Sequence, residues 1–118
     1  MVTIEQVAEA ALNREGLLLR SLAQDFLREY PNVSNYPKPQ TNDSRLLAAA
    51  ASLVELLALR LHQPPPSWTK DVGALAEPIY LLKAAASMKR LRALCESQAP
   101  EPLCKRGFYA PPNFLESA

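Results

Sequence analysis

Residues 44–62, SRLLAAAASLVELLALRLH, decide the fold because they are the most apolar stretch of the chain. Apolar side chains would surround most of a helix over this range, which predicts a buried central helix. Asn42 or Asp43 stands before it as a candidate N-cap. The stretch is shorter than the roughly 20 apolar residues that cross a membrane, and Glu55 and Arg60 interrupt it. We therefore expect a helix in the core of the protein.

The N-terminal segment carries a second helical pattern. Thr3 and Gln6 have the spacing of a capping box, and apolar residues then recur at three-, four- and seven-residue steps as far as Pro31. Because the apolar register continues across Gly16, we predict one helix over residues 4–30, with a kink or break at Asn13–Gly16 as the alternative. Such a helix would be about 40 Å long. It would overhang a body of this size, so it would need a partner.

Prolines divide the rest of the chain. Residues 64–66 are all proline and end the central helix, and Pro78 is compatible with the start of a helical turn. Ser87 is a candidate cap for a third helix that ends at Gln98. The tail, residues 103–115, is expected to dock on the helices as a strap. The sequence thus predicts an all-α fold of three main helices with proline-rich irregular segments, in one domain over residues 1–118, and it indicates no sheet.

Bulk properties narrow the function classes. The 118 residues have a formal net charge of +1, which gives no global attraction for nucleic acid or anionic membranes. The first residues do not have the pattern of a signal peptide, which favours a cytoplasmic location. Cys95 and Cys104 are then expected to be thiols, although their spacing leaves a disulfide open.

Candidate catalytic groups are few. The single histidine, His62, has no Cys, Asp or Glu at metal-ligand spacing, and its place at a helix end favours a structural role. The three glycines are scattered, so no phosphate-binding loop is present. Cys95 could act as a nucleophile only if its thiol were activated, and no neighbouring residue predicts that. We expect no catalytic activity, no metal and no cofactor, and we keep an enzyme that uses Cys95 as a third hypothesis.

The leading hypothesis is a protein-binding module that forms either a hetero-complex or a homodimer. Aromatic residues on stiff, proline-rich segments make good anchors for a partner because they lose little entropy on binding. Two roles are open for Trp68: an anchor for a partner, or a side chain that covers the end of the central helix. The second role is favoured. The predicted partner-binding residues are Leu19, Phe26, Tyr30, Trp68, Phe108, Tyr109 and Phe114.

A second hypothesis is a nucleic-acid-binding regulator. The second half of the chain has a mild excess of basic residues, which is less dense than the usual nucleic-acid footprint and is more typical of a solvated face. The residues that would bind are Lys89, Arg90, Arg92, Lys105 and Arg106.

Three stretches carry a resemblance: SRLLAAAASLVELLALR, PPPSWTKDVGALAEPIYL and LRALCESQAPEPLCKRGFYAPPNFLESA. They resemble a group of small bacterial helical proteins with a PPxW, EP, PEPL and APPNFL pattern, over roughly residues 44–118. Such proteins are often encoded beside nucleotidyltransferase-fold toxin-like proteins. The resemblance implies an antitoxin-like role in a toxin–antitoxin complex, and it carries over no catalytic residue.

Overall fold

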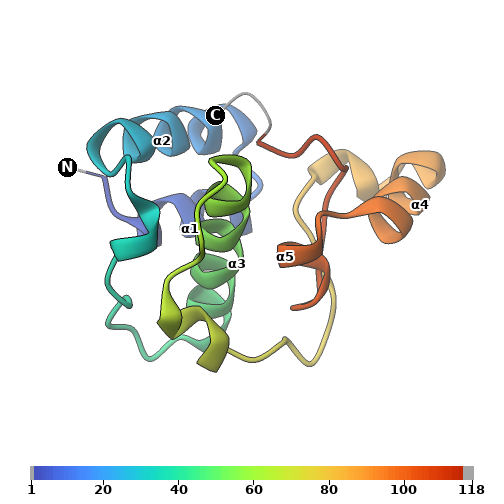
Figure 1. Ribbon diagram of the computed structural model, residues 1–118. Coiled ribbons are helices and arrows are strands. Elements are labelled where there is room, and N and C mark those ends of the chain that lie inside the picture. Colours follow the sequence, from blue (N-terminus) through green and yellow to red (C-terminus); the bar gives the residue numbers. More distant parts are fainter. Residues whose placement is uncertain (1, 116–118) are drawn as a thin grey trace.

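The computed structural model describes residues 2–115, and this part of the chain is mostly helical (Figure 1). The protein is thus a small helical fold, but it is not purely all-α. In chain order the elements are α1 (Ile4–Leu12), α2 (Gly16–Glu29), a 3-10 helix (Val33–Asn35), α3 (Ser44–Arg60), a 3-10 helix (Ser67–Asp71), β1 (Ile79–Tyr80), a 3-10 helix (Lys83–Ala86), α4 (Lys89–Gln98), α5 (Glu101–Cys104) and β2 (Phe108–Tyr109).

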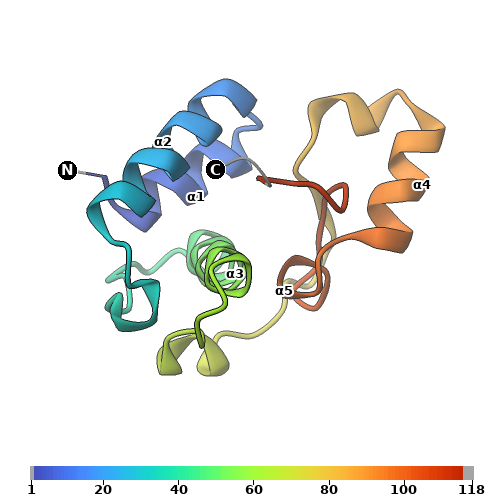
Figure 2. The ribbon, with the colours of Figure 1, turned by 45° about the horizontal axis from the view of Figure 1, so that its top comes forward.

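The prediction of a central helix is confirmed. Helix α3 lies between the α1–α2 pair on one side and α5 with the C-terminal tail on the other (Figure 2). Every residue from Ala48 to Ala58 is buried. The helix begins at the predicted cap, where the Asp43 carboxylate accepts hydrogen bonds from the backbone N–H groups of Arg45 and Leu46.

The prediction of one helix over residues 4–30 is wrong, because the chain reverses between α1 and α2. Arg14 has a φ of 58°, and the N–H groups of Arg14 and Glu15 donate to the carbonyls of Ala11 and Ala10. This is the Schellman pattern that closes a helix, built here without glycine. The molecule measures 38 × 27 × 25 Å, so a straight helix would leave part of its apolar stripe in water. The break lets both halves pack against the body. The predicted capping box of Thr3 and Gln6 is present.

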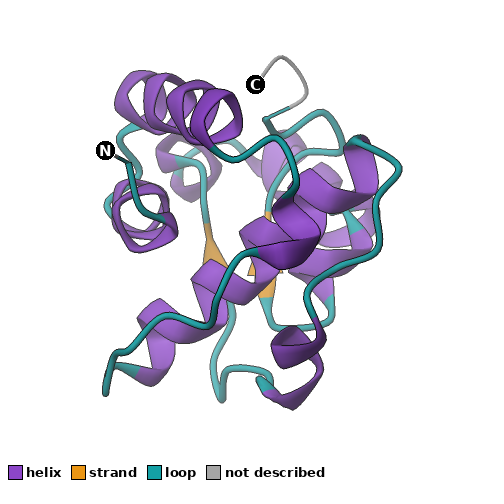
Figure 3. Ribbon diagram, turned by 60° about the vertical axis from the view of Figure 1, so that its left-hand side comes forward, coloured by secondary structure: helices purple, strands orange, loops and turns teal. Residues whose placement is uncertain are grey.

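A small parallel sheet joins two segments that are far apart in the sequence, as the strands in Figure 3 show. Ile79 pairs with Phe108, and Tyr80 pairs with Tyr109. The prediction that no sheet forms, and that Pro78 starts a helical turn, is therefore wrong. The pairing depends on contacts between residues 29 positions apart in the sequence, which no local pattern reveals. Pro78 fits because a proline directly before a strand removes no ladder hydrogen bond.

Helix α4 lies at the edge of the molecule (Figures 1 and 2). Cys95 is its one fully buried side chain. The predicted cap is wrong: α4 begins after Met88 with no side-chain cap, and the Ser87 hydroxyl instead donates to the carbonyl of Ala84. The predicted end at Gln98 is confirmed.

The tail packs on the helices as predicted for a strap. Phe108 and Ala110 are fully buried in the core, and Phe114 is nearly so. Arg60, in the last turn of α3, donates hydrogen bonds to the carbonyls of Pro112 and Phe114. Hydrogen bonds from the last turn of α3 therefore fix the position of the end of the tail.

Candidate functional site

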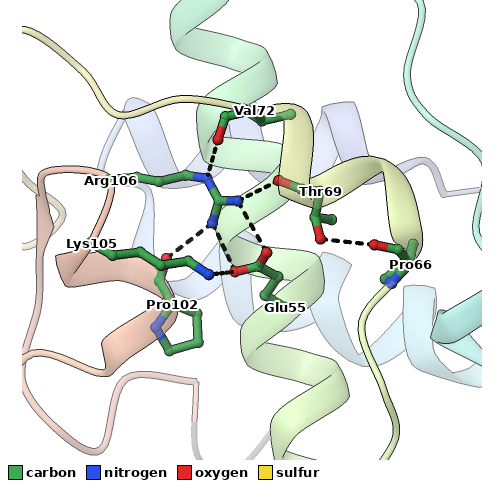
Figure 4. Close-up of polar contacts among 7 residues, drawn as sticks. All are labelled: Glu55, Pro66, Thr69, Val72, Pro102, Lys105 and Arg106. Atoms are coloured by element: carbon green, nitrogen blue, oxygen red, sulfur yellow. Dashed lines mark hydrogen bonds and ion pairs between the residues drawn. The ribbon is translucent and has the colours of Figure 1, made fainter.

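The most elaborate polar cluster surrounds Arg106, which follows α5 and is only 3% exposed (Figure 4). Its Nη1 and Nη2 donate to the two carboxylate oxygens of Glu55 at 2.8 and 3.0 Å. The same nitrogens donate to the carbonyls of Pro102 and Thr69, and Nε donates to the carbonyl of Val72. These five bonds use all five guanidinium N–H groups. Arg106 therefore joins α3, α5 and residues 69–72, and it has no donor left for a ligand.

Glu55 is the charge partner inside this cluster. Burial raises the pKa of its carboxyl, but hydrogen bonds from Arg106, Lys105 and Thr69 outweigh burial and bring the pKa to about 2. The Lys105 ammonium lies 2.7 Å from one Glu55 oxygen. The carboxylate is thus held ionised and fully engaged, which suits a structural link better than proton transfer.

The basic residues of the nucleic-acid hypothesis lie in two different places. Arg106 is buried and Lys105 is paired with Glu55, whereas Lys89, Arg90 and Arg92 are exposed on α4. Arg106 therefore does not share a surface with the α4 residues in this structure.

The predicted partner-binding residues lie mainly in the chain's own core. Leu19, Phe26, Phe108 and Phe114 are buried, and Tyr30, Trp68 and Tyr109 are half-buried. The ring of Phe26 lies 5.3 and 5.0 Å from those of Tyr30 and Tyr36. The Trp68 indole donates to the carbonyl of Tyr36 at 2.7 Å, which agrees with its favoured role as core cover. In this structure these seven residues do not form one exposed surface.

A different surface brings arginines together. One hollow of about 210 Å³ opens between the start of α2 and the tail. A second, of about 190 Å³, opens between the α1–α2 turn and α4, and the two share Arg14 and Leu82 as lining residues. Arg20 lines the first hollow and Arg92 the second. We call the two adjoining hollows the arginine groove.

Tyr80 marks the α4 end of the arginine groove. Its hydroxyl donates a hydrogen bond to Glu96, which raises the pKa of the phenol. The guanidinium of Arg92 lies 5.0 Å from the Tyr80 ring centroid and 3.8 Å from a Glu96 oxygen. The ring of Tyr109 lies 5.5 Å from the Tyr80 ring. Both the ring and the hydroxyl of Tyr80 are therefore engaged within the chain.

An exposed leucine stands beside this groove. Leu17 is 87% exposed in the first turn of α2. It precedes Arg20 by three residues, so the two side chains are neighbours on the helix surface. Leu17 is not itself a lining residue of the groove, but it lies next to Gly16 and Arg20, which are.

Local sequence patterns do not reveal this groove. Arg14 and Arg20 come to the same surface as Arg92 only because the chain reverses after α1. The break expected as an alternative at residues 13–16 was the one available signal.

The thiols do not favour nucleophilic chemistry. Both cysteines are free; Cys95 is buried and Cys104 is exposed. Burial, and then the charge of Glu96, raises the pKa of the Cys95 thiol, which is the opposite of activation.

Within residues 2–115, no cluster of three or more His, Cys, Asp and Glu side chains is placed to hold a metal ion. No helix in the same range combines the length and apolar character that crossing a membrane requires. Comparison of the chain with protein-family models, curated proteins and solved structures finds no match.

Proposed function

We propose that the chain is a non-catalytic protein-binding module. The observation that supports this proposal is Leu17, which is almost fully exposed in the first turn of α2, directly after the groove-lining Gly16. An exposed leucine alone is common on protein surfaces. Here the exposed leucine stands next to a hollow lined by arginines over an apolar floor, and arginine is a residue type that protein interfaces favour.

The resemblance to antitoxin-like proteins suggests the partner. We propose that it is a nucleotidyltransferase-fold toxin-like protein encoded beside this chain, and that binding restrains that protein. The test is co-expression of the two proteins followed by size-exclusion chromatography. One shared peak is expected at micromolar concentration. Two separate peaks would count against a protein-binding role with this partner.

A pair of matched variants locates the contact. Leu17→Glu should abolish co-elution because it places a charge in the interface. Leu59→Glu changes another exposed leucine, near the end of α3, and should leave the shared peak intact. Equal loss in both variants would mean that Leu17 has no special place in the contact.

A nucleic-acid-binding role is the second candidate, and the start of α4 favours it. Lys89 and Arg90 lie in the first turn, with no acidic residue there and no side-chain cap. Cations at this end oppose the helix dipole, and a bound phosphate would relieve that conflict. Affinity for an oligonucleotide should then fall steeply as salt is raised. A flat or undetectable response would remove this candidate.

A further inference from the structure

We propose that the arginine groove binds an acidic, leucine-bearing peptide segment of the protein partner. This inference rests on the protein-binding role proposed above and adds the location and the chemistry of the contact. In it, carboxylates of the segment pair with Arg14 and Arg20, and an apolar side chain between them fills the hollow next to α2.

The charges that line the groove favour an acidic ligand. The Nε of Arg14 donates to the carbonyl of Tyr80 at 2.9 Å, which fixes the side chain. Its two terminal nitrogens have no hydrogen-bond partner in the described part of the chain. Arg20 has neither a hydrogen bond nor an ion pair with any residue from 2 to 115. Guanidinium groups whose terminal nitrogens are not already bonded are suited to bidentate binding of carboxylates.

The shape of the hollow next to α2 favours an inserted side chain. Leu19, Leu81 and Phe114 form the floor of the hollow next to α2, and each is almost fully buried. The volume, about 210 Å³, is below the roughly 300 Å³ at which sites for drug-sized molecules begin. It is suited to an inserted side chain. The positive end of α2 also opens here at Gly16, with no side-chain cap.

The aromatic residues of the groove favour a peptide over a nucleic acid. Single-stranded nucleic acids are bound by stacking of their bases on open aromatic rings. The aromatic residues that line the groove are Tyr80 and Phe114. Tyr80 is engaged by Arg92 and Tyr109, and Phe114 is buried in the floor. With no open ring to receive a base, the arginines favour carboxylates on a chain that also carries apolar side chains.

The test is fluorescence anisotropy with the full-length chain and a short labelled peptide in which aspartate and leucine alternate. A peptide that alternates asparagine and leucine tests the charge, and a single-stranded oligothymidylate tests nucleic acid. We expect the acidic peptide to bind, the neutral peptide to bind at least about tenfold more weakly, and the oligonucleotide not to compete.

Two charge reversals on the same helix provide the matched variants. Arg20→Glu should weaken binding of the acidic peptide by about tenfold or more. Arg28→Glu makes the same change in net charge near the other end of α2, where Arg28 is exposed and paired with Asp25, and it should change binding less than about twofold. Circular dichroism checks that both variants fold.

Four results would overturn the proposal: no binding of the acidic peptide, equal binding of the neutral peptide, equal loss in the two variants, or tighter binding of the oligonucleotide. The co-expression experiment distinguishes failure of the groove as the binding site from failure of the protein-binding role itself. If the partner co-elutes with the wild-type chain and with Arg20→Glu alike, the protein-binding role stands and the groove is not its site. If the wild-type chain does not co-elute, the proposed role itself fails.

Discussion

At the scale of the residue, two helices end at a residue whose backbone has an unusual conformation. Arg14 and His62 have φ values of 58° and 57°, in the left-handed region that glycine adopts most easily. At His62 the N–H groups of residues 62 and 63 donate to the carbonyls of Leu59 and Ala58, which repeats the pattern at the end of α1. The single histidine therefore ends the central helix, as its predicted structural role requires.

His62→Gly should stabilise the protein. The left-handed conformation costs a residue with a side chain about 1–2 kcal/mol, and the greater freedom of glycine in the unfolded chain offsets part of the gain. We expect the free energy of unfolding to rise by about 0.5–1 kcal/mol in urea titrations. Leu59→Gly, at an exposed site inside α3, is the control and should lower stability by a similar amount. A loss of stability in His62→Gly would contradict this account.

Glu55→Gln should destabilise the protein strongly at neutral pH. It leaves Arg106 buried and without its charge partner, which typically costs about 3–5 kcal/mol. The pKa of Glu55 is about 2 in the folded protein and 4.5 without the contacts of the fold. The stabilising contribution of its charged form is therefore fully present above pH 4.5. That contribution is lost as the pH falls from 4.5 towards 2, and it amounts to about 3 kcal/mol.

Urea unfolding at several pH values checks this prediction. The difference in stability between the wild-type chain and Glu55→Gln should shrink as the pH falls below 4.5. Glu9→Gln, at an exposed site on α1, serves as the control and should show little difference at any pH. A difference for Glu55→Gln that stays constant down to pH 3 would mean that the carboxyl has an ordinary pKa.

At the scale of the element, burial is distributed unevenly. Helix α3 buries an unbroken run of eleven residues, from Ala48 to Ala58, whereas α4 fully buries Cys95 alone. Local opening is easiest where few apolar side chains are buried. Helix α4 should therefore open at lower free energy than the central helix, and it carries Arg92 at one end of the arginine groove.

The two thiols report on that opening. Cys104 is exposed and should react with a maleimide at once, whereas Cys95 should react at least about tenfold more slowly and faster in dilute urea. Mass spectrometry of Cys95→Ser and Cys104→Ser assigns each rate to its thiol. Rapid labelling of Cys95 near neutral pH would instead revive the hypothesis of an activated nucleophile.

At the scale of the whole molecule, a few long-range links join segments that local structure leaves separate. Arg106 connects α3, α5 and residues 69–72, and Trp68 connects the proline-rich segment to Tyr36. The small parallel sheet joins residues 79–80 to residues 108–109. Trp68 and Thr69 are adjacent in one short segment and take part in two of these links, so the links should break together.

Unfolding should therefore be cooperative. Trp68 is the single tryptophan, so its fluorescence reports on the proline-rich segment, while far-ultraviolet circular dichroism reports mainly on the helices. We expect the two urea transitions to share one midpoint, as in two-state unfolding. A fluorescence change that precedes the loss of helix would show that the segment around Trp68 detaches first.

Several features follow from the sequence alone. The apolar circumference of residues 44–60 determined the central helix, and local hydrogen-bonding groups at Thr3 and Asp43 determined where helices begin. These features depend on neighbours within one helical turn, so the sequence pattern contains them. The stiff, aromatic tail was likewise predictable as a segment that packs on the helices.

The tertiary structure alone decided the rest. The reversal at Arg14, the pairing of β1 with β2, and the bond between Glu55 and Arg106 each depend on contacts between distant parts of the chain. The apolar spacing on either side of Gly16 is the same whether one helix continues or two helices pack side by side. Only the need to bury both halves of that stripe in a small body selects the reversal, and the same reversal brings Arg14 and Arg20 into one groove with Arg92.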